Sequence, residues 1–314
     1  MPTLAALPKI AAKDFTRDLQ LSDDELHSLL TLAKDLKQNP EAFRTAARNR
    51  SVALLFEKPS LRTRFTFELA VGQMGGNSVF IDGPIGTREP VQDIARNLDR
   101  WVDAIVARTF TQQTIDALAK WAAVPVINAL SDLYHPCQAL ADILTLHEHF
   151  GDLKGRKLAF LGDGNNVAHS LMLSAARLGM HFALACPEGY LPDSGIRAQA
   201  EGLAIISGST VTITHNPEQA LENADAVYTD VWASMGQESE AARRAKIFAP
   251  FQVNRSAMQQ ANPEALFLHC LPAHRGEEVT DEVIESKQSA VFDQAENRLH
   301  AQKALLLMLL PNQS

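Results

Sequence analysis

Apolar residues recur along this chain with two different spacings, and segments of the two kinds alternate. From Ser22 onward, leucines and alanines lie three or four residues apart, which is the spacing of a helix with one buried face. Ser22 and Glu25 form a capping box at its start, and Asn39 followed by Pro40 is expected to end it. Other segments are short continuous apolar runs, which predict buried strands. The alternation predicts an α/β protein with parallel sheets and helices on both faces.

The predicted strands fall into two series. The first comprises residues 52–56, 77–81, 104–107 and 124–128, with helices expected from about Leu61 and after His135. The second comprises residues 157–161, 182–185, 211–214, 226–228, 266–269 and 290–292, followed by a helix over residues 293–310. The turn-rich segment GDLKG, residues 151–155, separates the two series.

This pattern predicts two doubly wound parallel-sheet domains, residues 1–150 and 151–314. The C-terminal helix, at about residues 294–310, is expected to pack back on the first domain. In doubly wound folds, ligands bind beyond the carboxyl ends of the strands. We therefore look for the chemistry there.

Composition and charge agree with this picture and exclude some functions. The chain has 314 residues, 46% of them hydrophobic and 21% charged, which suffices for two ordinary domains. Its 37 acidic and 29 basic residues give a formal net charge of -8, whereas binders of nucleic acids or anionic membranes need basic surface. The cysteines Cys137, Cys186 and Cys270 show no metal-binding spacing, and their odd number fits a reducing compartment. With no export signal or long apolar span in the sequence, we expect a cytoplasmic protein.

The segment EKPSLRTRFTFE follows the first predicted strand and is suited to binding an anion. Ser60 is placed to cap a helix, and helix N-termini bind phosphate through free backbone N–H groups. Thr63 adds a hydroxyl, and Arg62 adds a planar charged fork. Arg64 lies two residues from Arg62 on the helix and cannot face the same ligand. A capped helix with surface arginines explains the segment about equally well.

Two further strand ends carry polar side chains. Arg108 follows the third predicted strand, and His135 precedes Pro136, which suits the first turn of a helix. A neutral imidazole there can donate a hydrogen bond to a carbonyl oxygen. Taken singly, Arg108 is more often a surface charge and His135 a capping or packing residue. Three such groups at neighbouring strand ends favour a site for one small dianion.

In the second half, residues 162–167 superficially resemble a dinucleotide-binding turn. The third glycine is missing, yet Glu188 lies at a plausible distance for a ribose contact. A nicotinamide enzyme therefore stays open, as does a glycine turn without any ligand.

Later strand ends in this half carry Asp230 and Cys270. A carboxylate there can pair with a cationic amino acid, and a thiol near a cation can become a thiolate. Ser234 and Met235 lie on the loop behind Asp230, and Arg298 lies near the start of the last helix. A lone cysteine is usually inert packing, and Arg298 can equally belong to a solvated face.

Together these motifs resemble those of the aspartate and ornithine carbamoyltransferases, over essentially the whole chain. SLRTR at residues 60–64 looks like the family's carbamoyl-phosphate signature SxRTR, and HPCQ at residues 135–138 looks like its HPxQ. DVWASMGQE at residues 230–238 and HCLPAHRGEEV at residues 269–279 are similar to segments of the ornithine-specific members. DGNN at residues 163–166 resembles the family's ornithine-binding turn, which removes the need for NAD.

The resemblance assigns site residues position by position. It implies carbamoyl-phosphate contacts at Ser60, Leu61, Arg62, Thr63, Arg108, His135, Gln138, Cys270, Leu271 and Arg298. It implies ornithine contacts at Asn166, Asp230, Ser234 and Met235. The residues expected to act in catalysis are Arg62, Arg108, His135, Asp230 and Cys270.

The activity implied is transfer of the carbamoyl group of carbamoyl phosphate to the δ-amine of L-ornithine, giving L-citrulline and phosphate in arginine metabolism. No cofactor and no metal are implied. A homotrimer is implied, with the active site in the cleft between the two domains. The direction of the reaction and assembly beyond a trimer stay open. So do related amines such as putrescine and N-acetylornithine, a nicotinamide dehydrogenase and a catalytically silent binding protein.

One position departs from the family pattern. Many relatives have Gln or His before an Ile/Leu-Gly pair, in a residue that reaches into a neighbouring subunit's site. This chain has Pro84 before Ile85 and Gly86, and proline cannot donate that hydrogen bond. We expect the loop of residues 82–91 to contact the phosphate differently, through Thr87 or Arg88.

Overall fold

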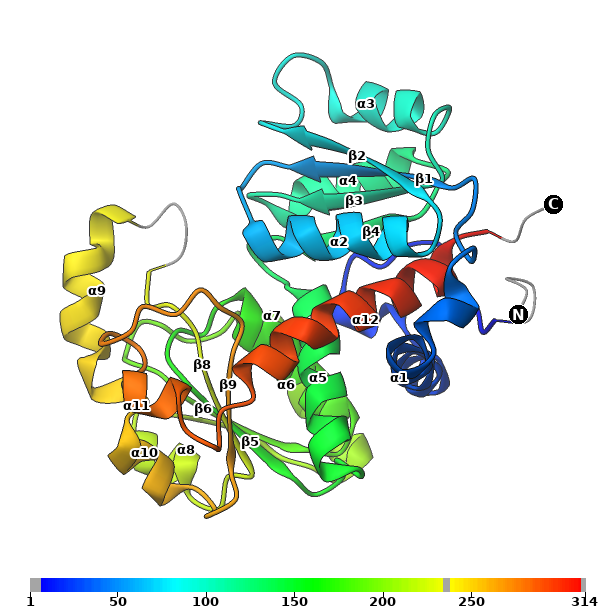
Figure 1. The fold of residues 1–314 in the computed structure, drawn as a ribbon. Coiled ribbons are helices and arrows are strands. Elements are labelled where there is room, and N and C mark those ends of the chain that lie inside the picture. Colours follow the sequence, from blue (N-terminus) through cyan, green and yellow to red (C-terminus); the bar gives the residue numbers. More distant parts are fainter. Residues whose placement is uncertain (1–6, 234–237, 312–314) are drawn as a thin grey trace. The chain divides into compact units, whose positions relative to one another are not determined.

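The computed structural model of the chain describes residues 7–233 and 238–311, which divide into two compact units. The first comprises the described residues up to Leu144 together with those from Glu296 onward, and the second runs from Thr145 to Ala295. Each unit is built on one parallel sheet, so the α/β fold expected from the apolar pattern is confirmed (Figure 1).

The sheet of the first unit has the order β2-β1-β3-β4. Its strands are β1 (Ser51–Phe56), β2 (Asn77–Asp82), β3 (Ala104–Arg108) and β4 (Val126–Leu130). Its helices are α1 (Asp23–Gln38), α2 (Leu61–Gln73), α3 (Val91–Leu98) and α4 (Gln112–Trp121), and α5 (Pro136–Phe150) begins in it. Short 3-10 turns lie at Asp18–Gln20 and Pro40–Phe43. The predicted capping box of Ser22 and Glu25 is present at α1.

Helices cover both faces of this sheet. Side chains of α3 and α4, including Ala95 and Leu118, pack with Leu55 and Ile105 of the sheet in one buried cluster. Figure 1 shows α2 on the opposite side of the sheet from α3. Polar side chains at the strand ends are thereby attached to a rigid, buried scaffold.

The sheet of the second unit has the order β7-β6-β5-β8-β9. Its strands are β5 (Lys157–Leu161), β6 (His181–Ala185), β7 (Val211–Thr214), β8 (Ala226–Thr229) and β9 (Leu266–His269). Its helices are α6 (Asn166–Arg177), α7 (Ser194–Ser207), α8 (Pro217–Leu221), α9 (Ala241–Phe248), α10 (Arg255–Gln260) and α11 (Asp281–Ile284). Short 3-10 turns lie at Glu238–Glu240 and Ala249–Phe251. The order reverses beside β5, as in doubly wound folds.

Two predicted strands need correction. Residues 290–292 are not a strand, because α12 (Val291–Leu309) begins there. Ser289 makes a single bridge with Phe267, after which Gln294 N–H donates to the Ala290 carbonyl and helical bonding takes over, with Asp293 suited to the first turn. The strand predicted at 124–128 is observed at Val126–Leu130, because Pro125 lacks the N–H needed for the ladder.

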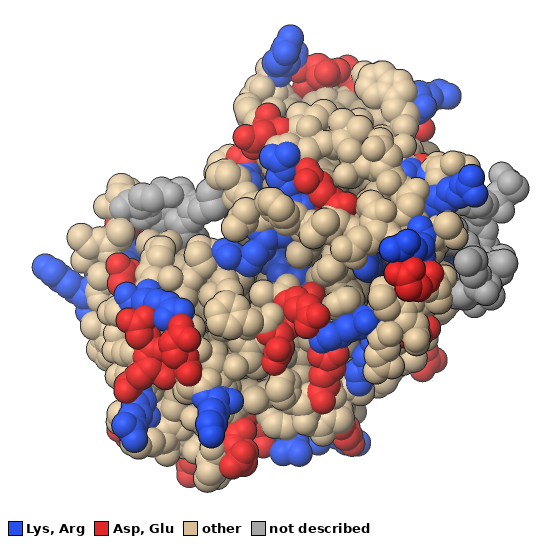
Figure 2. Space-filling model, viewed as in Figure 1, with Lys and Arg blue, Asp and Glu red and all other residues tan. Residues whose placement is uncertain are grey.

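The surface agrees with the charge argument. Figure 2 shows acidic and basic side chains intermixed over the face that it draws, without a continuous basic surface there. Among the described residues, the helices include none both long and apolar enough to cross a bilayer.

Candidate functional site

The SLRTR segment begins α2 just beyond the carboxyl end of β1. Ser60 is the N-cap, and its hydroxyl oxygen accepts a hydrogen bond from Thr63 N at 3.2 Å. The first turn of α2 contains no acidic residue that would oppose an anion there. The cap predicted from the sequence is therefore confirmed, and the helix start can accept a phosphate.

The two arginines of this segment differ in their surroundings. Arg64 forms an ion pair with Glu68 at 2.9 Å, and its guanidinium lies 3.8 Å from the centre of the Phe80 ring. Arg64 is thus engaged on the outer face of α2, as its spacing from Arg62 suggested. Arg62 is half-buried, whereas the side chain of Leu61 is exposed.

Arg298 joins three helices of the first unit. Its Nη2 donates to Thr63 Oγ1 at 2.6 Å, and its Nη1 donates to Gln138 Oε1 at 2.6 Å. All three side chains are buried, and Gln138 is itself oriented by donating to Asp142 Oδ1 at 2.7 Å. Arg298 therefore contributes a fixed buried charge beside the start of α2, and the reading of Arg298 as a solvated surface residue is wrong.

His135 and Arg108 are also buried in this unit. Arg108 is the last residue of β3, and its backbone carbonyl accepts a hydrogen bond from Glu57 N at 2.8 Å. Burial lowers the pKa of His135 well below its ordinary value, and the positive charges of Arg298 and Arg108 lower this pKa further. His135 is therefore neutral at physiological pH and able to donate a hydrogen bond without carrying a charge.

Glu57 is a residue that the sequence reasoning missed. One carboxylate oxygen accepts from Ile85 N at 2.9 Å, and the other accepts from Phe110 N at 2.8 Å. It thereby ties the segment that contains Pro84 to the end of β3. A carboxylate directly after β1 could have suggested such a role, but its two backbone partners lie far away in the sequence. Pro84, Thr87 and Arg88 are exposed.

In the second unit, parallel pairing brings Asp230 and Cys270 together. Thr229 of β8 is the register partner of His269 of β9, so the next residue of each strand leaves the same edge of the sheet. Cys270 Sγ donates to Asp230 Oδ1 at 3.0 Å. The two residues proposed from separate motifs thus form one polar pair.

Asn165 completes this group. Its Nδ2 donates to Asp230 Oδ2 at 2.8 Å, while its Oδ1 caps α6 by accepting from Val167 N and Ala168 N. Asn166, the residue that the resemblance assigned to ornithine, is the first residue of α6. The sequence reasoning missed Asn165, although an asparagine one residue before a predicted helix is a recognised cap signal.

The glycine turn before α6 has a packing explanation. A Cβ atom at Gly164 would lie 2.3 Å from Pro192 N and 2.6 Å from the Leu191 carbonyl carbon, so a larger residue would collide with backbone. Gly162 has a φ of 143°, which also favours glycine. The glycines of this turn are therefore explained by its backbone conformation and by its close approach to Leu191 and Pro192. Because they have this structural role, they no longer indicate a dinucleotide site.

His269, the residue before Cys270, forms a fully buried pair with Glu278. His269 Nε2 lies 3.1 Å from Glu278 Oε1, and His269 Nδ1 accepts from Leu271 N at 2.8 Å. His269 thereby fixes the backbone on the far side of Cys270, where Leu271 has a φ of 56°. The sequence reasoning quoted the motif but gave these two residues no role.

Within the part of the chain that the structure describes, two groups of side chains could hold a metal ion. Asp230, His269 and Cys270 each offer a ligand atom within 4.8 Å of the others, as do His274, Glu277 and Glu278. In the first group, the arrangement is already explained by hydrogen bonds from the Cys270 thiol to Asp230, from Leu271 N to His269 Nδ1, and between His269 and Glu278. We therefore treat it as a polar network rather than a metal site.

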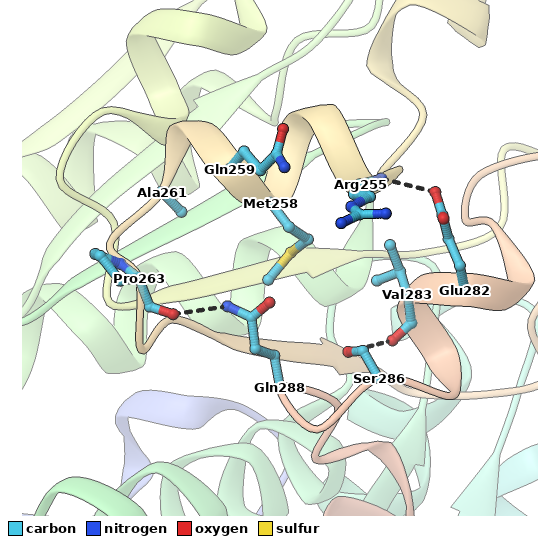
Figure 3. Close-up of a pocket in the computed structure, with 9 residues that line it drawn as sticks. All are labelled: Arg255, Met258, Gln259, Ala261, Pro263, Glu282, Val283, Ser286 and Gln288. Carbon is cyan, nitrogen blue, oxygen red and sulfur yellow. Dashed lines mark hydrogen bonds between the residues drawn. The ribbon is translucent and has the colours of Figure 1, made fainter.

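A separate pocket of about 600 Å³ lies elsewhere in the second unit (Figure 3). Met258 and Arg255 of α10 line it together with Val283 of α11, and Gln288 donates to the Pro263 carbonyl at 3.2 Å along its wall. None of the predicted site residues lines this pocket. Two of those residues, Ser234 and Met235, lie outside the described part of the chain.

Comparison with known proteins places both halves of the chain in one family. A model described as aspartate/ornithine carbamoyltransferase, carbamoyl-P binding domain, matches residues 13–148. A model described as aspartate/ornithine carbamoyltransferase, Asp/Orn binding domain, matches residues 154–309.

Individual relatives agree. A protein of Anoxybacillus flavithermus named ornithine carbamoyltransferase is 51% identical over 98% of this chain and 99% of its own length. A protein of Pyrococcus furiosus named ornithine carbamoyltransferase, anabolic, is 47% identical over 98% of each chain. The solved structure of ornithine carbamoyltransferase from Pyrococcus furiosus matches with a TM-score of 0.94 at 46% identity, covering 98% of this chain and 99% of that one. These similarities do not favour a nicotinamide dehydrogenase.

The neutral state of His135 predicts a pH effect on stability. As the pH falls below the ordinary histidine pKa of 6.5, the unfolded chain takes up a proton at His135 while the folded protein does not. Stability present above that pH is therefore lost as the pH falls. We expect His135→Gln to weaken the dependence of the melting temperature on pH below about 6.5.

Calorimetry of both proteins across this range measures the effect. His27→Gln, at an exposed histidine of the same unit, should keep the dependence of the unsubstituted protein. Identical slopes for His135→Gln and the unsubstituted protein would contradict a buried, neutral His135.

Proposed function

The chain belongs to the aspartate/ornithine carbamoyltransferase family, and we propose that it transfers the carbamoyl group of carbamoyl phosphate to the δ-amine of L-ornithine. The products are L-citrulline and phosphate. The observation that carries the choice of amine is Asp230, a buried carboxylate held by Asn165 and Cys270. A carboxylate there attracts a cationic amino acid, whereas the side-chain carboxylate of aspartate would be repelled.

The first unit is proposed to hold carbamoyl phosphate. The N-terminus of α2, with Ser60, Leu61 and Thr63, accepts the phosphate, and the buried charge of Arg298 supports it. Arg62, Arg108 and His135 stabilise the negative charge that develops on the carbonyl oxygen during attack. Gln138 orients Arg298 and lines the same group of residues.

The second unit is proposed to hold ornithine. The proposed contacts are Asn166, Asp230, Ser234 and Met235. We add Asn165 to them because it donates a hydrogen bond to Asp230. Cys270 and Leu271 act where the amine meets the carbamoyl group. His269, which is paired with Glu278 and accepts a hydrogen bond from Leu271 N, orients them.

The proposed chemistry requires an uncharged amine. An alkylamine has a pKa of about 10.4 in water, so the bound amine must lose a proton before its lone pair attacks the carbamoyl carbon. Asp230 and Cys270 are the candidates for positioning and deprotonating it, and the departing phosphate can accept the proton finally. Charge stabilisation comes from arginine, neutral histidine and a helix start, so the mechanism calls for no metal or organic cofactor.

We further propose that the reaction runs in the biosynthetic direction, toward citrulline in arginine metabolism, and that the protein is located in the cytoplasm. The direction rests on the similarity to the Pyrococcus furiosus relative whose name includes the word anabolic. The compartment rests on the three cysteines, which are thiols rather than disulfides and require no oxidising environment.

The homotrimer implied by the sequence resemblance is proposed to form through the first unit. Leu61, Phe65 and Leu69 of α2 lie four residues apart and expose 68%, 55% and 45% of their surface. Val79 and Ile81 of the edge strand β2 expose 49% and 51%. Apolar surface of this kind beside an unpaired strand edge is typical of a contact between protein chains.

The substrate assignment predicts a specific product. The purified protein should form citrulline and phosphate from carbamoyl phosphate and L-ornithine. Under the same conditions, putrescine, N-acetylornithine and aspartate should yield at most about 1% of that rate, because each lacks a charge that the site recognises or adds one that it repels. Product analysis by chromatography measures this. No product with ornithine alongside product with another amine would refute the choice of substrate.

The role of Cys270 predicts a selective defect. Cys270→Ala should lower turnover at least about tenfold, because positioning of the amine is lost, while the dissociation constant for carbamoyl phosphate changes little. Steady-state citrulline assays and calorimetric titration measure the two quantities. Cys186→Ala, at a buried thiol whose pKa burial raises to about 11, serves as the control and should keep normal turnover. Normal turnover in Cys270→Ala would remove that residue from the mechanism.

The proposed trimer predicts a mass of three times 34.4 kDa in solution. Phe65→Glu places a charge in the centre of the apolar surface and should shift the protein toward the monomer in sedimentation experiments. Ile205→Glu, at an isoleucine of α7 that is 83% exposed, should leave the mass unchanged. A trimer that survives Phe65→Glu would place the interface elsewhere.

A further inference from the structure

Arg244 of α9 is a buried arginine of the second unit to which no step of the mechanism assigns a role. Its side chain is 4% exposed. The guanidinium lies 4.7 Å from the centre of the Tyr190 ring and 5.0 Å from that of Phe248, which are packed edge to face. A planar cation in contact with two aromatic rings is restricted in its orientation.

The edges of this guanidinium bind two segments that lead to Asp230. Arg244 Nε donates to the carbonyl of Trp232, two residues after Asp230, and Nη2 donates to Asp163 Oδ2 in the turn before α6. One side chain thus connects α9 to the exits of both β8 and β5. A lysine could not make both contacts in this planar arrangement.

The turn before α6 carries this constraint to the amine-binding residues. The Asp163 carbonyl accepts from Asn165 N at 2.8 Å, and Gly164 N donates to the carbonyl of Tyr190 at 3.0 Å. Arg244 therefore contacts Asp163 directly. It also contacts the ring of Tyr190, whose backbone carbonyl holds Gly164. Asn165, fixed by this turn, donates to Asp230 Oδ2.

We propose that Arg244 is a positioning residue for the amine substrate, which sets the orientation of Asp230 by holding the Asp163 turn and the Trp232 carbonyl in place. The inference rests on the proposed function, because it concerns how the same enzyme binds ornithine. It adds a residue from α9 that is not among the proposed substrate contacts. Burial raises the pKa of the Asp163 carboxyl above its ordinary value, although the adjacent charge of Arg244 opposes this shift.

The test compares Arg244→Lys and Arg244→Met with the unsubstituted protein. Both substitutions should raise the KM for ornithine about tenfold or more, with the larger effect in Arg244→Met, because the Asp230 group is displaced. The KM for carbamoyl phosphate should stay within about twofold, since its proposed contacts on the first unit do not involve Arg244. Arg197→Lys and Arg197→Met, at an exposed arginine of the same unit paired with Glu201, are the matched controls and should leave both constants unchanged.

Asp163→Asn supplies a second variant that removes the other half of the ion pair and should show the same selective rise. An unchanged KM for ornithine in folded Arg244→Lys, or equal rises in both KM values, would overturn the inference. Loss of folded structure in all three variants, judged by circular dichroism, would also overturn it by showing a purely structural role. If the unsubstituted protein makes no citrulline, the proposed function fails first, and that result is independent of the variants.

Discussion

The parallel pairing of β8 with β9 is the constraint on which the amine-binding half of the protein depends. Because Thr229 and His269 are register partners, the chains leave the sheet side by side, and Asp230 and Cys270 meet at 3.0 Å. A shift of one residue would turn one of these side chains to the opposite face. The buried Glu278 and His269 below, and Asn165 beside, hold the pair in that arrangement.

The two units solve different electrostatic problems with the same architecture. In the first, burial and the positive charges of buried Arg298 and Arg108 keep His135 neutral, so the group combines fixed positive charge with an uncharged hydrogen-bonding ring. In the second, Asp230 is a buried acidic residue at a strand end, held by Asn165 and Cys270. Arg108 ends β3 and Asp230 directly follows β8, so both lie at the carboxyl ends of parallel strands, where doubly wound folds bind ligands.

Much of this arrangement was readable in the sequence, because it depends on local signals. Caps such as Ser22 and Ser60, and the prolines at positions 40 and 136, act on neighbouring backbone and were correctly placed. The wrong strand prediction also came from reading a local signal. Residues 290–292 look apolar enough for a strand, and only the bridge to Phe267 and the bond from Gln294 show why the helix begins there.

What the sequence could not supply were pairings between distant segments. Glu57 accepts hydrogen bonds from the backbone of Ile85 and Phe110. Arg244 binds the carbonyl of Trp232 and the carboxylate of Asp163, and Asp163 lies 81 residues before it in the sequence. No local spacing marks such partners, since an arginine on a short helix reads as surface charge until its burial is known. Residues proposed to contact the substrates stand out in motifs. Residues proposed to orient them are identified by their hydrogen bonds: Arg244, buried against two rings and bonded to Trp232 and Asp163, restrains the segments that it binds.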